Sequence, residues 1–283
     1  MAHTQPPIDE EVAVDEHDPH LYRNHTLAQS IPSFADIGPE HLTFFHQHGY
    51  LVIDQAFSSA QINAASNAIY DLIDGKNPEF RGLQMEAHAR GTELTDSARR
   101  LAVRKLMKFV DYDPRFQALA ADADLLQALE LLMDDEPIIF QEMALLKPPG
   151  GREKPWHQDC AYFNYPIGTT VIGVWISLDH ATPENGCLHI MPGTHNEGPV
   201  NHFKLRDWQI CDTEVQKERD VIVPLAPGGC LLWHGMLHHG SPRNQSQQPR
   251  RALQLHYQPT NAGQIETEER MQHFGGEVRG AEC

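Results

Sequence analysis

The stretch VIGVWISLDHATPENGCLHIMPGTH, residues 171–195, decides the fold class of this chain. It contains two short apolar runs, Thr170–Leu178 and Cys187–Met191, and each run ends near a segment rich in Pro, Gly or Asn. Apolar runs of this length with such boundaries are typical of β-strands joined by tight turns. These residues therefore predict two strands of an all-β core.

The same alternation of apolar runs and turn residues continues from residue 136 to residue 260. The further candidate strands are Ile138–Leu146, Trp156–Tyr162, Val221–Leu225, Cys230–His234 and Ala252–Gln258. Seven or eight short strands with this punctuation are typical of a barrel or a cupin-like jelly roll. We therefore expect a mainly β fold with flanking helices and a jelly-roll core over residues 136–260.

The chain before residue 136 has a different sequence pattern, with polar segments and predicted helices. Residues 1–30 are polar and acidic, which predicts a flexible arm. We expect helices over 38–49 and 58–72, a strand over 50–53, a loop or lid with some helix over 76–100, and a helix from Asp113-Pro114 to about Met133. Residues 31–270 then form one domain with a helical part over 31–135, and residues 271–283 form a C-terminal tail.

Composition excludes several classes of protein. The 283 residues include 39 acidic and 22 basic side chains, so the net charge of −17 argues against non-specific nucleic-acid binding but does not forbid an anionic ligand. The partner that we expect is a small-molecule substrate. The five cysteines include no Cys-x-x-Cys pair, which argues against a zinc finger or a disulfide framework and favours the cytoplasm. The start of the chain does not resemble a signal peptide, and no apolar run approaches the ~18 residues of a membrane span.

A metal site is indicated by His157 and Asp159. Residues i and i+2 of a strand project from the same face, so this pair can occupy adjacent positions on one metal ion. Two histidines and one carboxylate are the ligand set of non-haem Fe(II) oxygenases. The same His-x-acid pattern occurs at His195 and Glu197, but it follows a Pro-Gly turn, so we expect His195 to be a loop residue.

The third ligand must come from distant sequence, and the candidates are His234, His238, His239 and His256. His239 is followed by Gly240-Ser241, and Arg250 lies eleven residues after it. A dicarboxylate that binds the metal at one end needs a cation at the other, and Arg supplies a planar fork of two donors for this. The spacing therefore favours His239.

Taken together and in order, the motifs of residues 40–260 resemble those of the phytanoyl-CoA dioxygenase family of Fe(II)/2-oxoglutarate oxygenases. The matching pieces are Gly49-Tyr50-Leu51-Val52, Lys147-Pro148-Pro149, Trp156-His157-Gln158-Asp159, Gly173-Val174-Trp175-Ile176-Ser177-Leu178, Glu184-Asn185-Gly186-Cys187-Leu188, Met191-Pro192-Gly193-Thr194-His195, Gly228-Gly229, and His239-Gly240-Ser241 through Arg250. The resemblance implies a double-stranded β-helix core, which agrees with the expected jelly roll. It also implies Fe(II), 2-oxoglutarate and O₂ as cofactor and cosubstrates.

The resemblance also implies roles for individual residues. His157, Asp159 and His239 would be the metal ligands. Arg250 would pair with the far carboxylate of 2-oxoglutarate, with Ser241 close by and Trp175 on the strand beside it. Lys108 and Gln141 are two further candidates for contact with the cosubstrate. Arg251 is an alternative to Arg250, and the two lie on opposite faces if residues 250–258 form a strand.

These observations predict an enzyme that hydroxylates an unactivated C–H bond and releases succinate and CO₂. Halogenases that resemble this family have a small residue at the carboxylate position, so Asp159 favours hydroxylation. Desaturation or epimerisation would use the same ligands and stays open. A non-oxygenase cupin, acting as a metal sensor or an isomerase, is the rival class. The substrate would be selected by the variable segments 76–105, 160–170 and 196–220.

Overall fold

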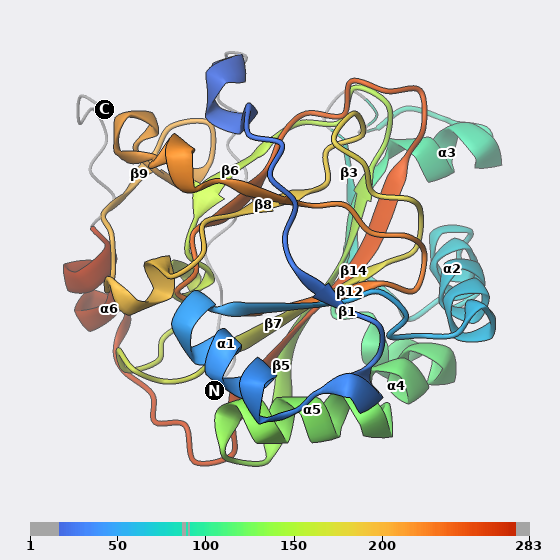
Figure 1. The fold of residues 1–283 in the computed structure, drawn as a ribbon. Helices are drawn as coiled ribbons and strands as arrows, with labels where there is room; N and C mark the ends of the chain where they lie inside the picture. The colour runs from blue at the N-terminus through green and yellow to red at the C-terminus, as the bar shows by residue number, and fades with distance from the viewer. Residues whose placement is uncertain (1–16, 87–88, 90, 276–283) are drawn as a thin grey trace.

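The computed structural model describes residues 17–86, 89 and 91–275, and two β-sheets form its centre (Figure 1). The larger sheet has the strand order β1-β2-β12-β7-β14-β5-β4-β3, and the smaller has the order β11-β8-β13-β6. The strands of the larger sheet are β1 (Ser30–Ile31), β2 (Tyr50–Ile53), β12 (Cys230–His234), β7 (Ile172–Ser177), β14 (Arg250–Pro259), β5 (Pro137–Lys147), β4 (Val103–Met107) and β3 (Leu83–Met85). Those of the smaller are β11 (Val221–Val223), β8 (Leu188–Ile190), β13 (His239–Ser241) and β6 (Lys154–His157).

The two sheets pack face to face, as a jelly roll requires. A buried cluster joins Val52, Trp175 and Leu231 of the larger sheet to Ile190 and Val223 of the smaller. A separate two-stranded ribbon pairs β9 (His202–Lys204) with β10 (Trp208–Ile210). The predicted fold class, mainly β with a jelly-roll core, is confirmed.

Helices cover the outer face of the larger sheet. They are α1 (Pro39–His48), α2 (Ser59–Ile73), α3 (Asp96–Ala102), α4 (Pro114–Ala120) and α5 (Ala123–Met133), and the later helix α6 (Thr267–Phe274) lies on the other side of the molecule in Figure 1. The largest buried cluster contains Ile69 of α2, Leu129 of α5 and Leu253 and Leu255 of β14. Because side chains alternate along β14, its even-numbered residues, from Arg250 to His256, point instead toward the smaller sheet.

The helix expected from Asp113 to Met133 is two helices. The carboxylate of Asp122 accepts hydrogen bonds from the backbone N–H groups of Asp124 and Leu125, each at 3.2 Å, and so caps a new helix. An N-cap satisfies backbone donors that a new helix would otherwise leave unpaired. The periodic apolar pattern continues across the break, so periodicity alone does not reveal it.

Two other segments differ from the sequence-based expectation. The region expected to be a loop or lid contains β3, which pairs with β4 just after that region and extends the larger sheet. The expected flexible arm falls partly on residues 1–16, which lie outside the described residues. Its later part packs closely: Leu21 and Tyr22 are buried, and the Leu21 carbonyl accepts a 3.2 Å hydrogen bond from Trp156 Nε1.

A prediction concerns Gly173, which lies beneath the buried Trp233 ring. A Cβ at this position would come within 2.3 Å of two atoms of the indole. Gly173→Ala should therefore destabilise the protein by about 1–3 kcal/mol through overpacking. Gly263→Ala is the matched control, because its Cβ would meet Pro166 Cγ at an ordinary 3.5 Å. Thermal unfolding of the two variants measures this, and equal midpoints would contradict the account.

Candidate metal centre

His157, Asp159 and His239 come together in the interior. Each is buried, and one ligand atom from each side chain lies within 4.8 Å of the others. Among the described residues no other group of three His, Cys, Asp or Glu side chains has this geometry. His157 ends β6, and His239 begins β13 directly opposite it in the antiparallel ladder. The grouping expected from the sequence is thus the one that the fold produces.

Asp159 reaches the site in a different way from the one expected. The strand ends at His157, and Asp159 begins a 3-10 turn, Asp159–Tyr162. Gln158 between them is extended, with φ −109° and ψ 131°, so the two side chains still project to the same side. His157 Nε2 lies 3.4 Å from Asp159 Oδ1, and His239 Nε2 lies 3.5 Å from Asp159 Oδ2.

The two imidazoles are held in the tautomer that a metal ligand needs. His157 Nδ1 lies 2.8 Å from the Pro155 carbonyl, and His239 Nδ1 lies 2.9 Å from the Leu237 carbonyl. A carbonyl oxygen only accepts, so each Nδ1 carries the proton and each Nε2 keeps a lone pair. Burial lowers the pKa of His157, and it lowers the pKa of His239 to about 3, so both rings are neutral.

The donor set therefore fits a metal cation. Two unprotonated Nε2 atoms face a carboxylate, and these lone pairs repel one another unless a cation lies between them. Burial opposes the charged form of Asp159, but hydrogen bonding from His256 helps to hold the pKa of Asp159 well below the usual range. Trp233 Nε1 and His256 Nε2 both donate to Asp159 Oδ2, at 3.0 and 2.9 Å.

The other candidate histidines have different roles. His256 is a hydrogen-bond partner of Asp159, and His234 Nδ1 accepts a 3.1 Å hydrogen bond from the Met236 N–H. His195 lies in the 3-10 turn Thr194–Asn196, and its Nε2 is 3.2 Å from the His46 carbonyl, which agrees with the expected loop position. His238 is buried beside His239, and its Nε2 has no partner in the described part of the chain.

A buried cation lies at the other end of the same inner face. Arg250 is 2% exposed, and its guanidinium carbon lies 5.3 Å from the ring centroid of Trp175. Arg250 Nη2 is 3.5 Å from Ser241 Oγ, whereas Arg250 Nε and Nη1 and Trp175 Nε1 have no hydrogen-bond partner among the described residues. Burial lowers the pKa of Arg250 to about 10. Buried donors without acceptors are costly, so this arrangement fits an anion such as a carboxylate.

Lys147 is a second buried cation there, and the sequence reasoning gave it no role. Lys147 Nζ donates to Ser241 Oγ at 2.7 Å and to the Pro242 carbonyl at 2.6 Å. Burial, and then the charge of Arg250, lower the pKa of Lys147 well below its usual value. In the sequence, only the Lys-Pro-Pro motif pointed to Lys147. Its position next to Arg250 results from the register of β5 and β14, which the sequence does not reveal.

Arg251 faces the opposite side, as the strand pattern predicts. It forms a two-point ion pair with Asp179, at 2.7 and 2.9 Å, and Arg251 Nη1 donates to Tyr70 Oη at 2.8 Å. Because Arg251 is already paired with the Asp179 carboxylate, Arg250 is the better candidate to bind a ligand carboxylate.

The two weaker candidates are placed differently. Gln141 is half-buried and lies opposite His256 in the pairing of β5 with β14, on the inner face. Lys108 is exposed and follows β4 with a positive φ of 53°, so the fold does not bring it into the buried group. By register Lys105, opposite Leu145, is the β4 lysine that faces inward, three residues before the expected one.

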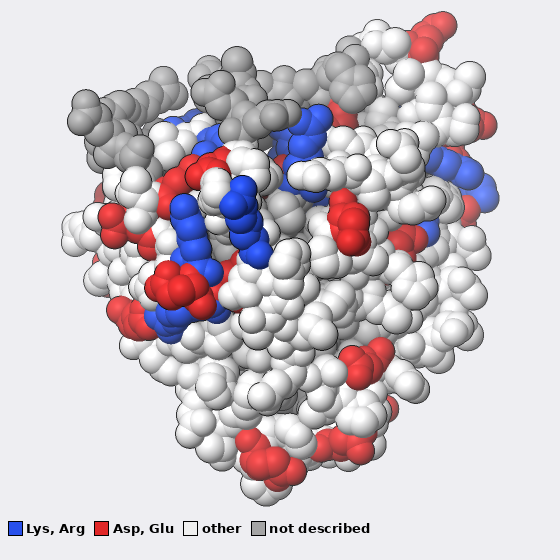
Figure 2. Space-filling model, turned by 45° about the horizontal axis from the view of Figure 1, so that its top comes forward, with Lys and Arg blue, Asp and Glu red and all other residues white. Residues whose placement is uncertain are grey.

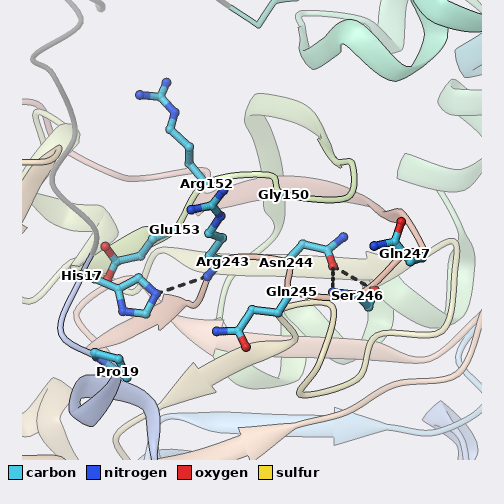
Figure 3. A pocket seen from close by; sticks show the side chains of 10 residues that line it. All are labelled: His17, Pro19, Gly150, Arg152, Glu153, Arg243, Asn244, Gln245, Ser246 and Gln247. Carbon is cyan, nitrogen blue, oxygen red and sulfur yellow. Dashed lines mark hydrogen bonds between the residues drawn. The ribbon is translucent and has the colours of Figure 1, made fainter.

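A surface hollow of about 600 Å³ lies apart from the triad, between the loops at residues 150–153 and 243–247 (Figure 3). Its lining includes Arg152, Arg243 and Gln245 but no metal ligand. Asn244, which also lines the hollow, donates a 3.3 Å hydrogen bond from Nδ2 to the Lys147 carbonyl. In the surface view, many basic side chains lie next to acidic ones (Figure 2).

Comparison with known proteins agrees with the site. Residues 45–252 match the family model of phytanoyl-CoA dioxygenase (PhyH), so the chain belongs to the phytanoyl-CoA dioxygenase family. It is 27% identical over 242 residues to the peroxisomal phytanoyl-CoA dioxygenase of Bos taurus, covering 81% of this chain and 71% of that protein. It is 28% identical over 258 residues to phytanoyl-CoA dioxygenase 1 of Oryza sativa, covering 80% and 90%.

Several solved structures share the fold. EvdO2 from Micromonospora carbonacea superposes with a TM-score of 0.66 at 23% identity, over 89% of this chain and 100% of that one. EctD from S. alaskensis gives 0.66 at 22% identity, over 93% and 88%. The 2-oxoglutarate-dependent epimerase SnoN gives 0.62 at 17% identity, over 81% and 87%.

Family and site together define the class of protein. The chain is a dioxygenase-family enzyme, and its triad and buried cations suit iron and 2-oxoglutarate as cofactors. In the described part of the chain, no helix combines the length and the apolar character that a membrane crossing requires.

The triad makes a prediction about metal binding. His157→Ala removes one of three ligands and should weaken Fe(II) binding by at least about 10-fold, in the range found when metal-site residues are lost. His195→Ala, which carries the same sequence pattern, should leave the affinity unchanged. Equilibrium dialysis under anaerobic conditions measures both, and the reverse order of effects would refute the assignment.

Proposed function

We propose that this protein is an Fe(II)- and 2-oxoglutarate-dependent dioxygenase that hydroxylates an unactivated C–H bond of a small molecule, with succinate and CO₂ as coproducts. One observation carries the proposal. A complete His-Asp-His triad and a buried arginine that has no ion pair in the described part of the chain share one internal surface. A keto acid with a second carboxylate at its far end is complementary to both.

In this proposal the chain's own residues bind and orient the reactants. His157, Asp159 and His239 would hold the iron through two imidazole nitrogens and the carboxylate, the ligand set of iron sites that keep open positions for other ligands. Arg250 and Ser241 receive the far carboxylate of 2-oxoglutarate, beside the ring of Trp175. Bound iron, with the keto acid and O₂, supplies the oxidising power for attack on the substrate C–H bond.

Lys147 has a supporting role in the same pocket. Ser241 Oγ accepts the 2.7 Å hydrogen bond from Lys147 Nζ, so the single hydroxyl proton of Ser241 is left to donate to the carboxylate. The two cations also offset the desolvation of an anion in a dry interior. Gln141, on the inner face near His256, is proposed to line the same space, and Lys108 is not retained.

Burial also gives the site its protection from water. All three ligands and Arg250 are buried, and Trp156, Trp175 and Trp233 are each at most 1% exposed. A water-poor cavity strengthens the electrostatic contacts to the bound keto acid and limits side reactions. These features have no use in a metal sensor or an isomerase that binds no dicarboxylate, so the non-oxygenase cupin is disfavoured.

Epimerisation and related oxidations remain the second candidate. The solved relatives include the epimerase SnoN and the carbocyclase SnoK, so this fold also supports reactions other than hydroxylation in those proteins. Hydroxylation is preferred because the family is named for a dioxygenase. The cytoplasmic location expected from the cysteine content stays a prediction.

Turnover provides the direct test of the proposed function. The protein supplied with Fe(II), 2-oxoglutarate and O₂ should form succinate, and members of a metabolite library that are substrates should increase this rate and gain 16 mass units. Products that lose two mass units would indicate desaturation, and products of unchanged mass would indicate epimerisation. No succinate from an iron-loaded sample would refute the proposal.

The two neighbouring arginines give a matched comparison. Arg250→Leu removes a charge-assisted hydrogen bond worth ~1.5–3 kcal/mol, so the 2-oxoglutarate concentration for half-maximal turnover should rise roughly 10- to 150-fold. Arg251→Leu should instead lower the unfolding temperature, because Asp179 loses its partner. Equal increases in the 2-oxoglutarate requirement would show that Arg250 has no special role.

A further inference from the structure

The Asp159 carboxylate has two inequivalent oxygens. Oδ2 accepts hydrogen bonds from both Trp233 Nε1 at 3.0 Å and His256 Nε2 at 2.9 Å. Among the described residues Oδ1 has no such donors. Each oxygen also faces one unprotonated imidazole nitrogen: Oδ1 lies 3.4 Å from His157 Nε2, and Oδ2 lies 3.5 Å from His239 Nε2. Two donors on one oxygen commit its lone pairs, so Oδ1 is the oxygen that is free to bind a cation.

Both donors are held on rigid elements. Trp233 lies on β12 and His256 on β14, the two strands that flank β7 in the larger sheet. Gly173 of β7 pairs with each of them, and the absence of a side chain there leaves the space that the Trp233 ring fills. Trp233 is 1% exposed and His256 is fully buried, so neither donor can be replaced by bulk water.

The contact with Asp159 determines which nitrogen of His256 carries a proton. Because Nε2 donates to the carboxylate, the lone pair of a neutral ring falls on Nδ1, which is buried without a hydrogen-bond partner among the described residues. Phe163 and Trp233 pack around the ring, at centroid distances of 5.0 and 5.9 Å. His256 Nε2 also lies 3.3 Å from Gln254 Nε2, but its contact with Asp159 is shorter, at 2.9 Å. A buried acceptor without a donor is unfavourable, so the contact with Asp159 explains the position of this ring better than its Nδ1 side does.

We propose that Trp233 and His256 are positioning residues that restrict Asp159 to metal coordination through Oδ1 alone. The inference rests on the proposed function and extends it. An octahedral ion has six positions, and a monodentate triad leaves three: two for the keto acid and one for O₂. A bidentate Asp159 would take one of these and compete with the keto acid. The two donors thus set the number of open positions without touching the metal.

The test measures two affinities separately on the full-length chain. Co(II) is titrated into the protein, and 2-oxoglutarate is then titrated into the Co(II)-loaded protein, both by calorimetry. In Trp233→Phe and in His256→Leu, Oδ2 loses a donor and turns toward the metal. We expect 2-oxoglutarate to bind at least about 5-fold more weakly, while Co(II) binds as tightly as in the wild type or more tightly.

A conservative variant supplies the control. The side-chain amide of His256→Gln retains a donor near the position of Nε2, so this variant should recover most of the 2-oxoglutarate affinity that His256→Leu loses. If Trp233→Phe does not fold, the comparison of His256→Leu with His256→Gln decides the matter alone, with folding confirmed by Co(II) binding and thermal unfolding.

Two results would overturn the inference. Equal weakening of Co(II) and 2-oxoglutarate binding would show a merely structural role, and unchanged affinities for both would show no role. Either result leaves the proposed function intact. A wild-type protein that binds Co(II) but no 2-oxoglutarate would instead refute the proposed function, so the two failures are distinguishable.

Discussion

The antiparallel pairing of β6 with β13 is the constraint on which the site depends. It sets His157 directly opposite His239, with ring centroids 4.1 Å apart, although 82 positions separate them in the numbering. The 3-10 turn that follows β6 then adds Asp159 from the same side. Because the larger sheet packs against this pair, β12 and β14 deliver Trp233 and His256 to the carboxylate. The metal centre is therefore a product of sheet pairing and not of a local motif alone.

The second feature of the interior is a pair of basic side chains, Arg250 and Lys147, with no ion pair among the described residues. Arg250 and Lys147 are both nearly inaccessible, and burial lowers the pKa of each. Burial disfavours the charged form of both side chains, so an unpaired charge at this place opposes folding. A bound dicarboxylate relieves this cost and, by mass action, stabilises the folded protein. The unfavourable burial of these two basic side chains is consistent with a site that is completed by its cosubstrate.

Sequence alone predicted much of this arrangement because strands and turns leave strong local signals. Most core strands were expected within a few residues, and strand alternation separated Arg250 from Arg251. The strand expected over 156–162 ends at His157, however, and β13 was not expected as a strand. The helix break at Asp122 and the pairing of β3 with β4 were missed, since apolar periodicity continues through the break and β3 and β4 have only three and five residues. Lys108 was expected in the site, yet the register selects Lys105 for the inner face.

The other features that the sequence did not predict are contacts between strands that are distant in the sequence. His239 and His256 could not be separated as ligand and hydrogen-bond donor by periodicity, because both end on the inner face. The spacing to Arg250 favoured His239 as the ligand, and the registers of β13 with β6 and of β14 with β7 show that His239 lies opposite His157 whereas His256 pairs with Gly173. Trp233 and Lys147 were equally hidden, since a Trp or a Lys at the end of a strand has no distinctive spacing.

The most direct measurement of the central claim is visible absorption of the anaerobic protein loaded with Fe(II) and then mixed with 2-oxoglutarate. Chelation of iron by the keto acid in the triad gives a weak charge-transfer band, and the account predicts this band in the wild type. A sample shown by dialysis to hold Fe(II), but with no band at saturating 2-oxoglutarate, would contradict it.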